Sequence, residues 1–186
     1  MEYRLQTPLT KTDAAKLRAG DTVLLSGTVY TARDAAHKRL CALADAGEAL
    51  PVDVRGAVIY YAGPTPARPG EVIGSVGPTT SGRMDAYAPA LLRMDLAGMI
   101  GKGARSEAVV AAMRESGAVY FAAIGGAGAL IASCVERAEL ICWPELGSEA
   151  VRRLTVRELP LIVAIDSTGA DLYKTGPAAY RKAAQG

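Results

Sequence analysis

Short apolar runs alternate along the chain with segments in which apolar residues recur at helical spacing. The run DTVLLSGTVYTA (21–32) is β-rich, and RDAAHKRLCALADAG (33–47) has the period of a helix and ends at a glycine. This alternation predicts an α/β fold with a mixed sheet. We expect strands at 21–32, 56–65, 71–80, 117–126, 139–146 and 159–169, and helices at 33–47, from Pro89 through Leu96, at 106–116 and at 127–138.

The connections between these elements point to one domain over residues 1–186. The segment GMIGKGAR (98–105) is expected to be a glycine-rich loop, and the tail at 177–186 a short helix or a frayed end. No internal repeat or linker divides the chain. Several predicted strands run into loops rich in glycine or hydroxyl residues, where ligands of α/β proteins tend to bind.

Composition excludes several classes of function. Half of the residues are hydrophobic and 22% are charged, which is typical of a globular domain. The net charge of +2 and the 5% of aromatic residues argue against a nucleic-acid-binding surface. No apolar run is long enough to cross a bilayer, and the N-terminal residues have no signal-peptide core, so we expect a cytoplasmic protein with no membrane partner.

The three cysteines, Cys41, Cys134 and Cys142, have no C-x-x-C spacing and do not suggest a disulfide framework. Three cysteines could in principle hold an iron–sulfur cluster with one open iron. Because two of them fall on predicted helices and one on a predicted strand, we expect small buried apolar side chains instead. The single histidine, His37, excludes a multi-histidine zinc site within the chain, so no metal ligand is assigned.

The segment TARDAAHKRL (31–40) contains a candidate anion site. Thr31 and Asp34 fit a capping box, which predicts a helix start and puts Arg33 in its first turn. Arg33 could be an ordinary surface residue, or it could bind an anion beside the free N–H groups of the helix. His37 could orient a ligand or a neighbour, or be a half-buried polar residue.

A second candidate site lies in GPTTSGRMD (77–85), which combines three consecutive hydroxyl residues with an arginine. Such a loop could be only a turn with local caps. Alternatively, Arg83 could hold a carboxylate while the Thr79 hydroxyl faces the reacting carbon, and Lys102 could add a third positive contact. Two arginines and a lysine on separate loops suit a small dicarboxylate.

These segments resemble the β subunit, or C-terminal domain, of the class I iron–sulfur fumarases and their L-tartrate dehydratase relatives. The resemblance covers nearly the whole chain. Its blocks are TPLT (7–10), GDTVLLSGTVYTARDAAHKRL (20–40), YAGPTPARPG (61–70), GPTTSGRMD (77–85), GMIGKG (98–103), AIGGAGALIA (123–132) and ELGSEAV (145–151).

The resemblance implies a swivelling β/β/α domain and the reversible addition of water to fumarate, which gives L-malate. It also implies a partner α subunit that holds a 4Fe-4S cluster through three cysteines, in an assembly of two α and two β subunits. By the same resemblance, the cysteines of this chain are not cluster ligands.

The resemblance also assigns roles to matching residues. Thr79 resembles the base that removes the C3 proton of malate, and Arg83, Arg33 and Lys102 resemble ligands of the substrate carboxylates. The supporting residues are His37, Asp34, Asp85 and Thr80, with the two aspartates expected to orient the adjacent arginines. A threonine can act as a base only if positive charge lowers its pKa and water is excluded, so the site should be assembled at a subunit junction.

Within the resemblance, three positions bear on the choice between fumarate and tartrate as the substrate. The tartrate enzymes tend toward a C-R-D-x-C-H segment and a bulkier residue in place of Gly82, so Ala32, Ala36 and Gly82 favour the fumarase pattern. A β subunit of an L-tartrate dehydratase or of a mesaconate hydratase, and a non-catalytic anion-binding module, are the alternatives.

Overall fold

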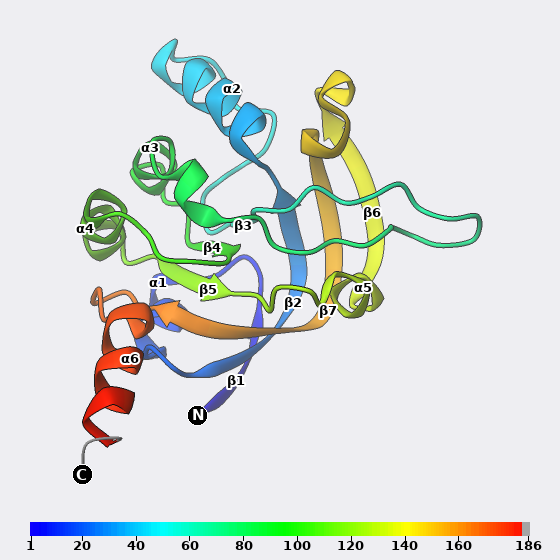
Figure 1. The fold of residues 1–186 in the computed structure, drawn as a ribbon. Helices are drawn as coiled ribbons and strands as arrows, with labels where there is room; N and C mark the ends of the chain where they lie inside the picture. The colour runs from blue at the N-terminus through cyan, green and yellow to red at the C-terminus, as the bar shows by residue number, and fades with distance from the viewer. Residues whose placement is uncertain (184–186) are drawn as a thin grey trace.

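One mixed sheet of seven strands organises the chain, in the order β1-β2-β3-β4-β5-β7-β6 (Figure 1). The structure is a computed structural model and describes residues 1–183. The mixed sheet confirms the expected α/β class. The strands are β1 (Glu2–Gln6), β2 (Thr22–Thr31), β3 (Val58–Tyr60), β4 (Gly98–Gly101), β5 (Val119–Ala122), β6 (Val135–Cys142) and β7 (Val151–Ile165).

Helices cover the sheet mainly on one side, where α2, α3 and α4 lie next to one another (Figure 1). The last helix begins before Pro177, which lies inside it, and residues 184–186 of the predicted tail are outside the described part of the chain. The helices are α1 (Lys11–Lys16), α2 (Asp34–Asp45), α3 (Ala88–Leu92), α4 (Glu107–Ser116), α5 (Gly128–Ser133) and α6 (Leu172–Ala183), with 3₁₀ turns η1 (Ser81–Met84) and η2 (Pro144–Glu149).

The long strand β7 closes the sheet on itself. It pairs antiparallel with β2 from Thr22↔Ile162 to Thr31↔Arg152, and its last residues pair antiparallel with β5. Strands β2, β3, β4 and β5 are parallel neighbours in that order, so together with β7 they form a closed ring of paired strands. Closure leaves none of these five strands with a long free edge.

The core has two parts, one on each face of the ring. In β3, Val58 and Tyr60 belong to the cluster inside the ring, whereas Ile59 and the following Tyr61 pack in the cluster beneath the helices. Successive strand residues point to opposite faces, so both faces of β3 are buried. This explains why the sequence shows continuous apolar runs here rather than alternation.

Three predictions about elements are wrong. Residues 71–80 form no strand, because the chain there pairs only through isolated bridges at Pro78 and Thr80. The predicted loop 98–105 opens with β4, whose four residues are all buried between β3 and β5. The predicted helix 127–138 ends at Ser133, because the residues after it pair with β7.

Other differences are of length. Strand β7 begins at Val151, eight residues before the predicted start, and β6 begins before the predicted strand at 139. Strand β1 and helix α1 were not predicted, although Thr10 and Asp13 form a capping box at the start of α1. The predicted helices at 33–47 and 106–116 are confirmed by α2 and α4, the second with Ser106 as its N-cap.

A long excursion follows β3 and returns at Pro78, where Ala62 bridges to Pro78. Figure 1 shows it extending past β2, β7 and β6. Residues 65–72 are exposed, and one backbone bond, from Thr65 N to Ser75 O at 3.0 Å, links its two sides. We call residues 63–77 the arm.

Candidate active site

The predicted site residues lie where parallel strands end. Arg33 follows β2 and Lys102 follows β4, and the chain of residues 77–85 crosses these ends. Its Thr79 N–H donates to the carbonyl of Tyr61 after β3 at 2.7 Å, and its Ser81 N–H donates to the carbonyl of Lys102 at 2.9 Å. The structure therefore brings these three segments together at the carboxyl edge of the sheet, which the sequence alone could not show.

The underside of the 77–85 loop is anchored by a buried pair of hydroxyls. The Tyr120 hydroxyl donates to the Gly103 carbonyl at 2.9 Å, so its 2.8 Å contact with Ser81 has Ser81 Oγ as the donor. Gly101 makes this approach possible, because a Cβ at that position would lie 1.9 Å from Ser81 Oγ. The loop is thus tied to the sheet from below.

Asp85 forms a second anchor, and its partner differs from the expected one. Its carboxylate accepts from Arg105 Nε at 2.7 Å and from the Ser106 N–H at 2.6 Å. The Arg105 side chain is completely buried between the rings of Tyr61 and Tyr120. Asp85 therefore holds Arg105 rather than Arg83. Sequence reasoning missed Arg105, whose only signal is its place two residues after the G-K-G motif.

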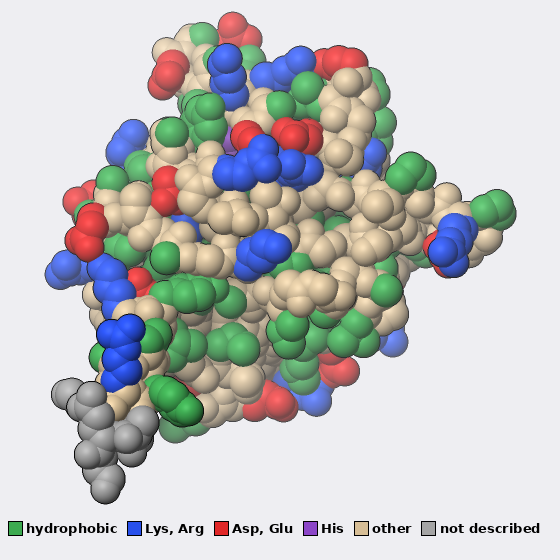
Figure 2. All heavy atoms as spheres, viewed as in Figure 1, with side chains coloured by type: hydrophobic (Ala, Val, Ile, Leu, Met, Phe, Trp, Pro, Cys, Tyr) green, Lys and Arg blue, Asp and Glu red, His purple; other side chains and the backbone are tan. Residues whose placement is uncertain are grey.

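The upper side of the loop carries the side chains that can reach a ligand. Arg83 donates through Nε and Nη2 to one oxygen of Asp34, and half of the Arg83 side chain is exposed. Thr80 and Lys102 are exposed and bridge through their backbones, and Thr79 is half-buried. Figure 2 shows two groups of Lys and Arg side chains near the middle of this face, the upper one beside acidic side chains.

Of the glycines after β5, Gly128 is the one whose missing side chain leaves room for these loops. A Cβ at Gly125 would meet the Lys102 side chain at 3.7 Å, and one at Gly128 would lie 2.4 Å from Ser75 Oγ and 3.0 Å from the Gly77 nitrogen. Gly128 therefore permits close approach of α5 to the start of the 77–85 loop.

The start of α2 differs from the predicted capping box. Thr31 ends β2, and its hydroxyl accepts from the Arg152 N–H at 3.2 Å, so it caps no helix. Arg33 is the N-cap and makes no side-chain cap bond. The carboxylate of Glu149, from η2, occupies the anion site that was predicted at the start of α2. It accepts from the Ala35 N–H at 3.1 Å and lies 3.2 Å from Arg33 Nη2.

His37 is fully buried beneath this corner, not half-buried as one interpretation had it. Its Nδ1 lies 2.9 Å from the Arg33 carbonyl, which can only accept, so Nδ1 carries the proton. Burial lowers the pKa of His37 to about 4, although the bond to Arg33 works in the other direction. The ring is therefore neutral at pH 7, and it packs edge-on against Tyr61 at 5.2 Å between centroids.

The cysteines lie on separate elements. Cys41 is in α2, Cys134 follows α5, and Cys142 ends β6. Each thiol is free and only partly buried, whereas buried side chains were predicted. Burial raises the pKa of all three thiols. Within residues 1–183, no group of three or more His, Cys, Asp or Glu side chains is placed to hold a metal ion. The residues present therefore do not fit a cluster held by this chain alone.

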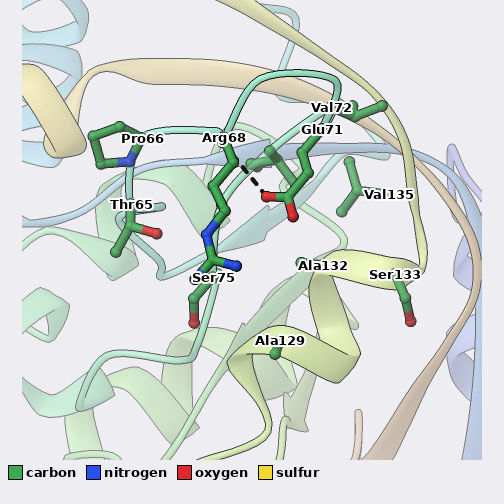
Figure 3. A pocket seen from close by; sticks show the side chains of 12 residues that line it. Thr65, Pro66, Arg68, Glu71, Val72, Ser75, Ala129, Ala132, Ser133 and Val135 are labelled. Carbon is green, nitrogen blue, oxygen red and sulfur yellow. Dashed lines mark hydrogen bonds between the residues drawn. The ribbon is translucent and has the colours of Figure 1, made fainter.

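A cavity of about 450 Å³ lies apart from these loops, between the arm and α5. Figure 3 shows Arg68 and Glu71 of the arm over it, with Ala129, Ala132 and Ser133 of α5 on the opposite wall. The eight predicted site residues do not line it. The converging loops thus form an open surface rather than this cavity.

Of the helices within 1–183, none is both long and apolar enough to cross a bilayer.

Comparisons with known proteins point in one direction. The family model described as fumarase C-terminus matches residues 1–176. A Methanocaldococcus jannaschii protein, provisionally named L(+)-tartrate dehydratase subunit beta, is 39% identical over 180 residues, which cover 94% of this chain and 92% of that protein.

Two longer relatives are named as fumarases. The anaerobic class I fumarate hydratase of Escherichia coli is 40% identical over 153 residues, and fumarate hydratase 2 of Leishmania major is 39% identical over 158 residues. The matches cover 81% and 83% of this chain but only 28% of each relative.

Proposed function

The chain belongs to the fumarase C-terminus family, and on that premise we propose that it is one part of a hydro-lyase that interconverts fumarate and L-malate. One observation carries the proposal. Three cationic side chains, Arg33, Arg83 and Lys102, come from three segments that meet at the carboxyl edge of the sheet, and Thr79 lies in the same loop as Arg83. A C4 dicarboxylate needs a cation at each end and a proton acceptor between them.

In this proposal the arginines and the lysine bind the two carboxylates of malate. The Thr79 side chain, as its alkoxide, then takes the proton from C3, the C3 electron pair forms the double bond, and the C2–O bond breaks. The departing hydroxide takes up a proton from solvent and leaves as water, and Thr79 later returns its proton to solvent. Thr79 is suited to this role because its backbone is fixed to the Tyr61 carbonyl at 2.7 Å. Nearby positive charge lowers the pKa of a hydroxyl, and this makes proton abstraction feasible once water is excluded.

The exposure of Arg83, Thr80 and Lys102 supports a shared site. Such a surface needs a cover before a threonine can act as a base. The fumarase relatives extend far beyond the matched region, and the shorter relative is named as a beta subunit. We propose that an α subunit supplies the cover and holds a 4Fe-4S cluster, in an assembly of two α and two β subunits. That cluster would supply a Lewis acid for the departing hydroxyl.

A second candidate is the β subunit of an L-tartrate dehydratase. The end-to-end match with the M. jannaschii protein favours it, because that relative has almost the same length. Tartrate differs from malate by a hydroxyl at C3, so the same cations would bind its carboxylates. Ala32, Ala36 and Gly82 weigh toward fumarate by the pattern described above.

The test is anaerobic co-expression with the candidate α subunit, cluster reconstitution, and assays with fumarate, L-malate, L-tartrate and mesaconate. We expect turnover of fumarate and malate by the complex and none by this chain alone. Preference for tartrate or mesaconate would reassign the substrate. Full activity of the chain alone would disprove the shared site, and failure of the two chains to associate would favour a non-catalytic anion-binding module.

Two variants separate chemistry from binding. Thr79→Ala should lower kcat by about 10²–10⁴-fold with a small change in KM, since it removes only the proton acceptor. Arg83→Ala should instead raise KM by roughly 10–100-fold, because a charge-assisted bond to a carboxylate is lost. Thr79→Ser keeps the hydroxyl and should retain part of the activity. Unchanged turnover by Thr79→Ala would remove Thr79 from the catalytic role.

A further inference from the structure

Glu149 is the functional-site neighbour that none of the assigned roles explains. It lies in the ELGSEAV block (145–151), at the end of η2 and more than a hundred residues from Arg33. Its two carboxylate oxygens do different things. One lies 3.2 Å from Arg33 Nη2, and the other accepts from the Ala35 N–H at 3.1 Å. Glu149 therefore joins the Arg33 side chain to the first turn of α2.

The backbone holds Arg33 on another side. A Cβ at Gly63 would lie 3.0 Å from Arg33 Nη1, 3.1 Å from Arg33 Cδ and 3.0 Å from the Ser148 carbonyl oxygen. A side chain at residue 63 would press on both neighbours, so the guanidinium is closely enclosed between the start of the arm and η2. The Arg33 side chain is 20% exposed and that of Glu149 is 23% exposed.

The enclosed guanidinium of Arg33 still has a hydrogen-bond donor without a partner. Its Nε is buried and has no hydrogen-bond partner in the structure. The contacts fix the direction of the guanidinium without using all of its donors. A planar guanidinium can bind a carboxylate through two parallel bonds only when its plane is correctly oriented.

We propose that Glu149 is a positioning residue: it orients the Arg33 guanidinium toward one carboxylate of the substrate. This rests on the proposed function, in which Arg33 binds that carboxylate. The helix dipole favours an anion at the start of α2, so Glu149 is held there even when the substrate is absent. The substrate then meets an arginine that is already in place, and less freedom is lost on binding.

The test uses the reconstituted complex of this chain with its α subunit and compares Glu149→Gln with Glu145→Gln. Glu145 is a matched control because it pairs with Arg39, again between η2 and α2, on the exposed surface. We expect Glu149→Gln to raise KM for fumarate by about tenfold with a smaller change in kcat, and Glu145→Gln to leave both unchanged. Thermal unfolding of the two variants should differ little.

A double-mutant cycle shows whether Glu149 acts through Arg33. If it does, Arg33→Ala combined with Glu149→Gln should have the KM of Arg33→Ala alone, whereas independent roles would multiply the two effects. A structural role would lower the unfolding temperature of Glu149→Gln without this coupling. Should Glu149→Gln fail to fold, Glu149→Asp serves instead, because its shorter side chain cannot reach both partners.

The outcomes distinguish this inference from the proposed function. If Arg33→Ala raises KM and Glu149→Gln does not, the positioning role is overturned and the proposed function stands. If Arg33→Ala itself leaves KM unchanged, Arg33 does not bind the substrate, so its assigned role and the positioning role both fail, while turnover of fumarate still supports the proposed hydro-lyase. A tenfold rise in KM with full coupling supports the positioning role.

Discussion

Arg33 and Arg83 are expected to do the same job, yet the molecule supports them differently. Arg33 is 20% exposed and is enclosed by Glu149, Gly63 and the start of α2, whereas Arg83 is 51% exposed and its side chain is held by Asp34. The contrast is between a cation whose side chain is enclosed and one whose side chain is exposed. Under the proposed function, the enclosed arginine would set where the substrate lies and the exposed arginine could adjust to it.

The backbone beneath Arg83 is nevertheless as firmly held as that of Arg33. Ser81 and Asp85 on either side of it reach into the sheet and bond to Tyr120 and Arg105. Freedom in the 77–85 loop is therefore confined to its upper side chains. Changes below the loop should cost stability, and changes above it should cost mainly binding.

The largest expected effect comes from breaking the loop's buried anchor. Asp85→Asn leaves the charge of fully buried Arg105 without its partner, which should lower the free energy of unfolding by about 3 kcal/mol or more. Urea unfolding of the purified chain measures this directly. The loss should be accompanied by faster hydrogen exchange in the 77–85 loop.

The matched control is Asp34→Asn, which removes the carboxylate charge beside the exposed side chain of Arg83. An exposed ion pair contributes at most about 1 kcal/mol, so its unfolding curve should stay close to that of the parent. If both substitutions lowered the free energy of unfolding equally, the distinction between the anchored underside of the 77–85 loop and its exposed upper side chains would be wrong.

The next effect is the pH dependence of the free energy of unfolding, which we expect from the buried His37 next to Arg33. Because the pKa of folded His37 is about 4 and that of an exposed histidine is near 6.5, the unfolded chain binds a proton between these pH values and the folded chain does not. The free energy of unfolding should therefore fall as the pH drops from about 6.5 to 4, by up to ~3 kcal/mol.

Urea unfolding at a series of pH values checks this, with His37→Phe as the comparison. That variant should be less stable at pH 7 but should lose much of the slope above pH 4.5. Asp13, Asp21 and Asp166, whose pKa values are lowered, act below this window. A parent protein with no slope between pH 6.5 and 4.5 would show that His37 is not buried in solution.

The smallest effect sharpens the comparison within one loop. Gly101→Ala would place a Cβ 1.9 Å from Ser81 Oγ and should cost about 2 kcal/mol through overpacking. Gly82→Ala, on the upper side, meets nothing within 4 Å and should change stability by less than about 0.5 kcal/mol. Chemical denaturation of the two variants side by side gives the difference.

The sequence predicted what local pattern controls. The apolar runs and helical periods located β2, α2, α4 and β5. The glycine- and hydroxyl-rich segments drew attention to Thr79, Arg83 and Lys102, although the strand predicted at 71–80 is absent. The residues 98–101 were mistaken for loop because two glycines weaken a strand pattern, although buried neighbours on both sides make them β4.

What the sequence could not show are pairings between distant segments. Three features join residues far apart in the chain: closure of the ring by β7, the ion pair of Glu149 with Arg33, and the burial of Arg105 between two tyrosines. Periodicity carries no information about such partners. The Thr31–Asp34 pattern is a case in point, because a motif typical of a helix cap is overridden by the pairing of Thr31 with β7.

Ring closure by β7 also sets an order of events during synthesis on the ribosome. Strand β2 is made early, but its antiparallel partner lies at residues 151–165, so the ring must stay open until most of the chain has emerged. Arg33 and Glu149 are separated in the same way. Arg33 of a nascent chain therefore lacks its ionic partner until that late segment arrives, and a chain that stops short of residue 149 carries the 31–40 and 77–85 segments without the carboxylate that pairs with Arg33.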